Sequence, residues 1–208
     1  MKTHSNAYID FINQIDATGY QKAQGYDPDL FNKIDDRERA EVEQIVVEQF
    51  KKGDRATAMF LPQIKSIDGS ALLKEELEKW NPPHIVNAEL AHILYKATND
   101  DSYENLLIED LKITTKSYRS TVVGYLLDCK PSEKLENIFK EIYTIDTATI
   151  ARFNAAIGFA YCKDLLKSTI NLDYDNPIFD LVRALSSGVE EERLKAEEKI
   201  AELGGNEA

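Results

Sequence analysis

The residues of this chain best suited to metal chemistry are Glu89 and His92, which lie three positions apart. On a helix this spacing places both side chains on one face, and it is half of the ligand set of a di-metal helical bundle. The chain has no second Glu-x-x-His. His84 precedes His92 by eight residues, about 12 Å along a helix, which is too far for one ion. We therefore favour a polar pair facing a groove, and we expect no metal and no cofactor.

Nucleophilic chemistry would have to come from Cys129 or Cys162, the two cysteines of the chain. Both lie in apolar helical runs, which favours buried thiols over a disulfide and a reducing cytoplasm over an oxidising compartment. A cysteine nucleophile needs a histidine beside it, and His92 leaves that alternative open. The sequence contains neither a glycine-rich phosphate loop nor a nucleophile elbow. We therefore expect a protein that is not an enzyme.

A short pattern recurs along the chain: a polar residue followed by apolar residues three and seven positions later. Its four copies are Asn87-Leu90-Leu94, Arg119-Val122-Leu126, Arg152-Ala155-Phe159 and Arg193-Ala196-Ile200, preceded by a fragment, Arg55-Ala58. They start about 32 residues apart, except for a longer last step of 41 that spans an insertion. Such a period is typical of stacked units that are each too small to bury their own apolar face.

The pattern falls on helices that come in pairs, so the predicted fold class is all-α. The first helix of each pair is amphipathic, whereas the second is apolar over a wider arc and is expected to lie between neighbours. Few glycines and prolines argue against an all-β fold. We expect about five pairs from residue 36 onward, one of them including a helix over 54–65. Residues 1–35 would form an N-terminal helical cap, and 36–208 the array, in a single domain.

The three copies that begin with arginine resemble the second helix of HEAT repeats, in particular the short variety found in phycobilisome lyases. The resemblance covers residues 36–203 and implies an α-α superhelix, or solenoid. Members of this class are mostly scaffolds, adaptors and inhibitors that hold another protein in a concave groove. The arginines of such repeats usually pair with an acid or a carbonyl of the neighbouring unit, so we interpret them as structural.

The register of the pattern separates a core face from an inner face on each second helix. Residues three and seven positions after the polar residue should point into the core. Those two, six and nine positions after it lie about 140° away, at ~100° per residue. The residues predicted to bind a protein partner on this face are Glu89, Ile93, Lys96, Thr121, Tyr125, Asp128, Asn154 and Tyr161, with Gly158 between the last two. Tyrosine and acidic residues suit such a surface.

Charge limits the kinds of partner. Thirty-seven acidic against 25 basic residues give a net charge of −12, which repels phosphate backbones and disfavours nucleic acid. A basic protein would be attracted. The expected function is a protein-binding scaffold or inhibitor, in its most concrete form a bacterial immunity protein that neutralises a basic toxin domain. The alternative is an accessory or lyase-type subunit that acts on a bilin-bearing protein.

The sequence also bears on location. Its start lacks the apolar stretch of a signal peptide. No segment has the ~18 consecutive apolar residues of a membrane span. We therefore expect a cytoplasmic protein without a membrane partner.

Overall fold

The computed structural model describes residues 4–23, 25–79, 85–169, 172 and 175–204. In these ranges the chain forms 13 helices and no strand, which confirms the all-α expectation. The chain divides into two compact units, Met1–Lys79 and Trp80–Ala208, and each is described by itself. The predicted boundary between a cap and an array at residue 36 stays a prediction.

The first unit is built around an aromatic core. Its helices are α1 (Asn6–Asp16), α2 (Gly19–Ala23), α3 (Pro28–Asn32), α4 (Asp36–Lys51), the 3₁₀ helix η1 (Arg55–Gln63) and α5 (Gly69–Glu78). Phe11, Tyr26, Phe31 and Phe60 pack with ring centroids 4.7–6.2 Å apart. The core thus joins the N-terminal helices to η1.

The segment expected to be an α-helix over residues 54–65 is a 3₁₀ helix instead. Pro62 lies inside it, and a proline has no N–H to donate and clashes with the carbonyl four residues earlier. The 3₁₀ helix has hydrogen bonds three residues back and is usually shorter than the nine residues found here. Thr57, Ala58, Phe60 and Leu61 are nevertheless buried, so the segment keeps its place in the core.

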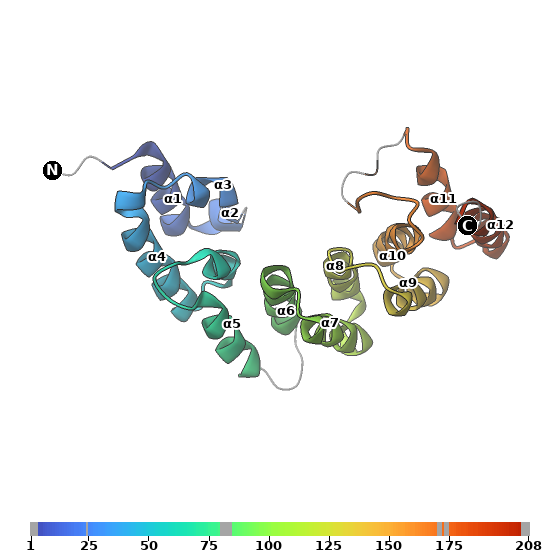
Figure 1. Cartoon of the computed structure of the whole chain (residues 1–208), viewed down its shortest axis with the longest axis horizontal. Helices are drawn as coiled ribbons and strands as arrows, with labels where there is room; N and C mark the ends of the chain where they lie inside the picture. Colours follow the sequence, from blue (N-terminus) through green and yellow to red (C-terminus); the bar gives the residue numbers. More distant parts are fainter. Residues whose placement is uncertain (1–3, 24, 80–84, 170–171, 173–174, 205–208) are drawn as a thin grey trace. The chain divides into compact units, whose positions relative to one another are not determined.

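The second unit is a row of helices that pack in chain order (Figure 1). They are α6 (Ile85–Thr98), α7 (Asp101–Ile113), α8 (Lys116–Leu126), α9 (Glu133–Ile145), α10 (Thr149–Cys162), α11 (Pro177–Leu185) and α12 (Glu190–Gly204). α7 with α8, α9 with α10 and α11 with α12 are consecutive antiparallel pairs, and α8 packs against both α6 and α10. The expected stacking of helix pairs is therefore present in this unit.

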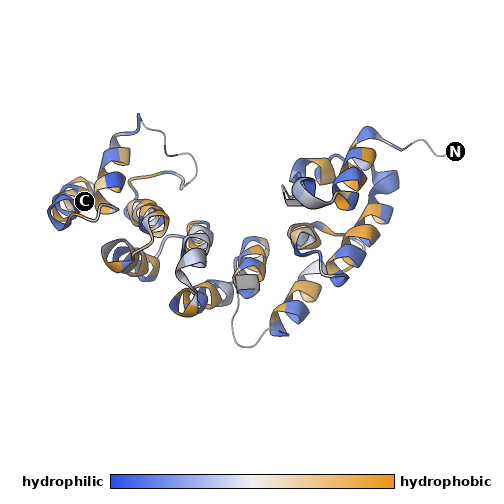
Figure 2. Cartoon of the chain, turned by 180° about the vertical axis from the view of Figure 1, so that it is seen from behind, coloured by the Kyte–Doolittle hydropathy of each residue, from blue (hydrophilic) through white to orange (hydrophobic). Residues whose placement is uncertain are grey.

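Each second helix buries the two apolar residues of the repeated pattern. All eight side chains are at most 5% exposed: Leu90, Leu94, Val122, Leu126, Ala155, Phe159, Ala196 and Ile200. The helices carry hydrophobic and hydrophilic residues on different sides (Figure 2). The predicted core face is thus confirmed. In the part of the chain that the structure describes, no helix is both long and apolar enough to cross a membrane.

One arginine of the pattern, Arg119, connects the ends of neighbouring helices. Arg119 donates through Nη1 to the carbonyl of Leu111 at 2.6 Å and pairs with the buried carboxylate of Asp146, which follows α9. The carbonyl belongs to α7, the partner of α8 in its own pair, whereas the acid follows α9 of the next pair, so the pairing with Asp146 is the structural role that we expected. Arg55, in the first unit, pairs with Glu76 of α5 at 2.5 Å.

The structure shows a further copy of the pattern in α4, in addition to those predicted from the sequence. Arg39, the fourth residue of α4, donates to the carbonyl of Phe31 eight residues earlier, as Arg119 does with Leu111. Val42 and Val46, three and seven residues later, are fully buried. Arg119, Arg152 and Arg193 are likewise the fourth residues of α8, α10 and α12. α4 therefore corresponds to a second helix of the repeat.

Candidate functional site

The side-by-side packing of α6 and α8 brings two of the predicted inner-face residues into direct contact. Lys96 Nζ on α6 lies 3.2 Å from Asp128 Oδ2, just beyond the end of α8. The same carboxylate oxygen accepts a hydrogen bond from Nε2 of His92 at 2.8 Å. His92 and Lys96 are four residues apart, which places them on one face of α6. Asp128 thus joins the two helices at this surface.

Tyr125 completes the cluster from the α8 side. Its ring stacks on the imidazole of His92, with centroids 4.4 Å apart and planes inclined by 15°. Glu89, one turn before His92 on α6, is close enough that its charge helps to raise the pKa of Tyr125. We call Glu89, His92, Lys96, Tyr125 and Asp128 the α6/α8 face. Four of its members were predicted as binding residues, whereas His92 was considered as the helix neighbour of Glu89 and as a candidate partner of a cysteine nucleophile.

Burial sets the protonation states of the α6/α8 face. It lowers the pKa of His92, against the opposing effect of Asp128. Burial would raise the pKa of Asp128, but hydrogen bonds from His92 and Lys96 outweigh it and leave that pKa lowered. Since a carboxylate only accepts, the neutral imidazole carries its proton on Nε2. Burial also raises the pKa of Tyr125 to about 12. Near pH 7 His92 and the Tyr125 phenol are therefore neutral and lie beside the Asp128 carboxylate.

The remaining predicted residues differ in exposure and in contacts. Ile93 is half-buried and Thr121 is exposed. Asn154 of α10 donates through Nδ2 to the carbonyl of Ser120 at 3.2 Å, so its amide ties α10 to α8. Tyr161 is half-buried near the end of α10.

The placement of Gly158 on the inner face is wrong. Gly158 is buried, and a Cβ at this position would lie 2.5 Å from the ring of Phe139 on α9. Because α10 packs closely on α9, α8 and α11, it has less free surface than the repeat register predicts. The absence of a side chain at Gly158 allows α10 to pack closely against α9.

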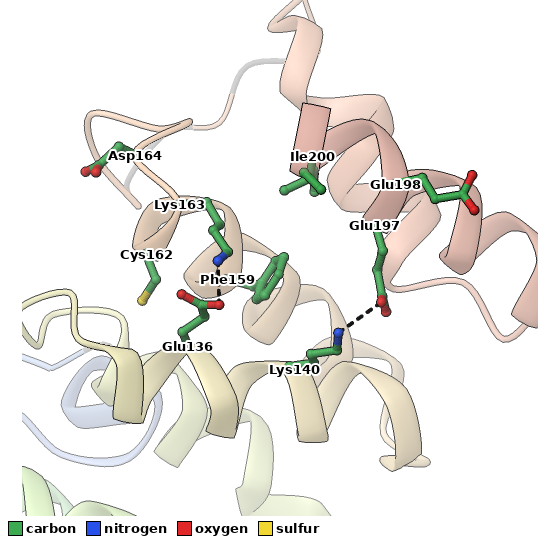
Figure 3. Close-up of a pocket in the computed structure, with 10 residues that line it drawn as sticks. Glu136, Lys140, Phe159, Cys162, Lys163, Asp164, Glu197, Glu198 and Ile200 are labelled. Carbon is green, nitrogen blue, oxygen red and sulfur yellow. Dashed lines mark ion pairs between the residues drawn. The ribbon is translucent and has the colours of Figure 1, made fainter. Parts of the chain in front are cut away.

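A second candidate site is a cavity of about 760 Å³ between α9, the end of α10 and α12 (Figure 3). Two ion pairs border it: Lys163 with Glu136 at 2.6 Å, and Lys140 with Glu197 at 3.1 Å. Its other lining residues are Phe159, Cys162, Asp164, Glu198, Ile200 and Ala201. Four acidic residues and two lysines surround its apolar side chains, so the lining carries a net negative charge.

The thiols show no sign of activation. Burial raises the pKa of Cys129 to about 12, and burial likewise raises the pKa of Cys162. A thiolate is the reactive form of cysteine, and activated cysteines have a lowered pKa. Both thiols are free and are expected to be protonated at neutral pH.

In the described ranges, no three His, Cys, Asp or Glu side chains are grouped as metal ligands. Comparison with protein-family models, with curated proteins and with solved structures found no match for this chain.

Proposed function

We propose that this chain is a HEAT-like helical-repeat protein that binds another protein without catalysis, and that the α6/α8 face is the binding surface. The observation that carries the proposal is that Asp128 contacts both His92 and Lys96 across two neighbouring helices, while the His92 ring stacks on Tyr125. The stacked rings and the shared carboxylate limit the freedom of these side chains before a partner arrives. A surface fixed in advance loses less entropy on binding.

The proposed partner is basic. The second unit has 22 acidic and 14 basic residues, a net charge of −8, and the whole chain has −12. Such a field increases the rate at which a cationic protein associates. In its most specific form, the proposal is an inhibitor that neutralises a basic protein domain, as an immunity protein does.

The geometry suggests how a basic side chain would be accepted. The Lys96 side chain is 60% exposed and contacts Asp128 at 3.2 Å, and exposed ion pairs of this kind contribute at most about 1 kcal/mol. An arginine of the partner can therefore displace Lys96 and take its place on Asp128. The guanidinium would then make the planar contact that an ammonium cannot, beside the half-buried stack of Tyr125 and His92.

The test is capture from the source cell with the purified chain as bait, followed by calorimetry with the purified partner. We expect wild type to capture a basic protein, in a salt-sensitive manner. Asp128→Lys should weaken binding by at least about ten-fold, and Asp128→Asn by less. Glu109→Lys, a change of equal charge at an exposed position of α7 (66% exposed), is the matched control.

Two results would contradict the proposal: a bait that captures no basic protein at physiological salt, or equal loss of binding in Asp128→Lys and Glu109→Lys. Melting curves of both variants show whether a loss comes from unfolding. If the captured protein instead carries a bilin, the lyase-type function replaces the one proposed.

A further inference from the structure

The turns between paired helices in the second unit expose large apolar side chains. At the α7–α8 turn, Ile113 is 57% and Tyr118 49% exposed; at the α9–α10 turn, Ile145 and Ile150 are each 67% exposed. The two positions in each turn are related by a step of 32 residues. Val189, at the α11–α12 turn, is 52% exposed. Each of these three turns thus exposes large apolar side chains, which are normally buried.

Hydrogen bonds and an ion pair hold the first two turns together. Arg119 links the carbonyl of Leu111, at the end of α7, to the carboxylate of Asp146, which also accepts from the N–H of Ala148 at 2.8 Å. The four exposed residues each lie within two positions of these groups along the chain: Ile113, Tyr118, Ile145 and Ile150. They therefore share one edge of the stack, which we call the turn edge.

The third turn continues this edge. A Cβ built at Gly188 would lie 3.8 Å from the guanidinium of Arg152, the residue of α10 that corresponds to Arg119. Gly188 immediately precedes Val189 in the α11–α12 turn. The second and third turns therefore adjoin, as the first and second do.

The turn edge is also poor in charge, although 30% of the chain is charged. Segments 113–118 and 144–150 contain one charged residue each, Lys116 and Asp146. The Asp146 side chain is 3% exposed and is neutralised by Arg119. The other residues around the apolar side chains are threonine, serine and alanine. An apolar patch with a neutral polar rim is typical of a protein interface.

We propose that the turn edge is a self-association surface, and that its occupant is a second copy of this chain. The edge consists of two halves of the same chemistry, repeated after 32 residues. A two-fold axis between the halves sets Ile113 and Tyr118 of one copy against Ile145 and Ile150 of the other, and the reverse. Every apolar group then meets an apolar group, as an isologous interface requires.

Charge favours a second copy over the basic partner proposed for the α6/α8 face. The turn edge offers no exposed carboxylate to a cationic protein in the described part of segments 113–118 and 144–150. Two copies, each at −12, repel one another over their acidic surfaces and can approach at this edge, where Lys116 and Asp146 are the charged residues of the two segments. Four side chains exposed by half to two-thirds give on the order of 400 Å², about half of one partner's share of a standard interface. The surrounding threonines would contribute the rest.

Sedimentation velocity of the full chain, from about 1 µM to about 200 µM, tests the proposal. Wild type should shift from monomer to dimer as concentration rises. Ile145→Glu and Ile145→Lys should each raise the dimer dissociation constant at least about ten-fold, although they change the net charge in opposite directions. Leu203→Glu, at a 41% exposed position near the end of α12, should have no such effect. A monomer at all concentrations would overturn the proposal, as would a dimer that both Ile145 variants leave intact.

Cysteine cross-linking tests the two-fold register. With Cys162→Ser in both chains, Ile113→Cys of one copy should form a disulfide with Ile145→Cys of another when the two variants are mixed and oxidised. A disulfide requires Cα atoms within about 7 Å. Cross-linking of each variant only with itself would reject this register.

Discussion

The imidazole of His92 lies flat on the ring of Tyr125 while its Nε2 donates to Asp128, so one side chain of α6 makes two contacts with the region of α8. Stacking fixes the plane of the imidazole, and the hydrogen bond fixes its rotation. His92 therefore connects the aromatic and charged parts of the α6/α8 face. Lys96 and Glu89, on its own helix, and Tyr125 and Asp128 are the titratable groups around it.

The stability of the protein should fall on mild acidification because of His92. Burial lowers its pKa below the ordinary value of 6.5, so just below that pH the unfolded chain binds a proton that the folded chain does not. The stabilisation from neutral His92 is thus fully present above about pH 7 and is lost as pH falls toward the lowered pKa. Asp128, whose pKa is also lowered, acts in the same direction at lower pH.

His92→Gln should flatten this dependence between about pH 7 and about pH 5, because an amide can donate to Asp128 and does not titrate. Urea unfolding followed by circular dichroism measures the effect. An NMR titration of the His92 ring gives its pKa directly, and a midpoint above 6.5 would contradict the prediction.

Replacing Arg119 should lower the free energy of unfolding substantially. Arg119→Ala leaves the Asp146 carboxylate (3% exposed) without its charge partner and the Leu111 carbonyl without its donor. Breaking a buried ion pair from one side costs about 3–5 kcal/mol, and we expect about 2–4 because Arg119 itself is 24% exposed. Denaturant unfolding measures the loss.

The matched control is Arg183→Ala, whose pair with Asp180 is 71% and 78% exposed; it should change stability by no more than about 0.5 kcal/mol. A second variant, Asp146→Asn combined with Arg119→Ala, should recover part of the loss, because no buried charge is left unpaired. Equal effects of Arg119→Ala and Arg183→Ala would refute a structural role for Arg119.

Two glycines of the second unit should respond in opposite ways to alanine. Gly158→Ala places a methyl 2.5 Å from the buried ring of Phe139, and such overpacking costs about 1–3 kcal/mol. At Gly124, in α8, the nearest atom is the Asn154 amide nitrogen at 3.8 Å. Gly124→Ala should therefore keep the helix-propensity gain of up to about 1 kcal/mol. Melting temperatures of the two variants decide between these outcomes.

Sequence patterns that act within one helix predicted the structure well. Burial at the third and seventh positions follows from 3.6 residues per turn, which any helix obeys whatever its neighbours. The same spacing is present in Arg39-Val42-Val46 and could have identified α4 as a second helix. Pro62 made a break in an α-helix over 54–65 foreseeable, because its ring clashes with the carbonyl four residues earlier and it has no N–H to donate.

The sequence by itself thus determined the helical class, the core positions and the role of Arg119 in bridging helix ends. Only the tertiary structure decided which surface residues meet. The contact of His92 with Asp128, 36 residues apart, depends on how α6 and α8 are rotated against one another, and packed side chains set that rotation. The same packing buried Gly158 and brought the exposed isoleucines of successive turns to one edge. Helical periodicity is local, whereas contact between helices depends on distant parts of the chain.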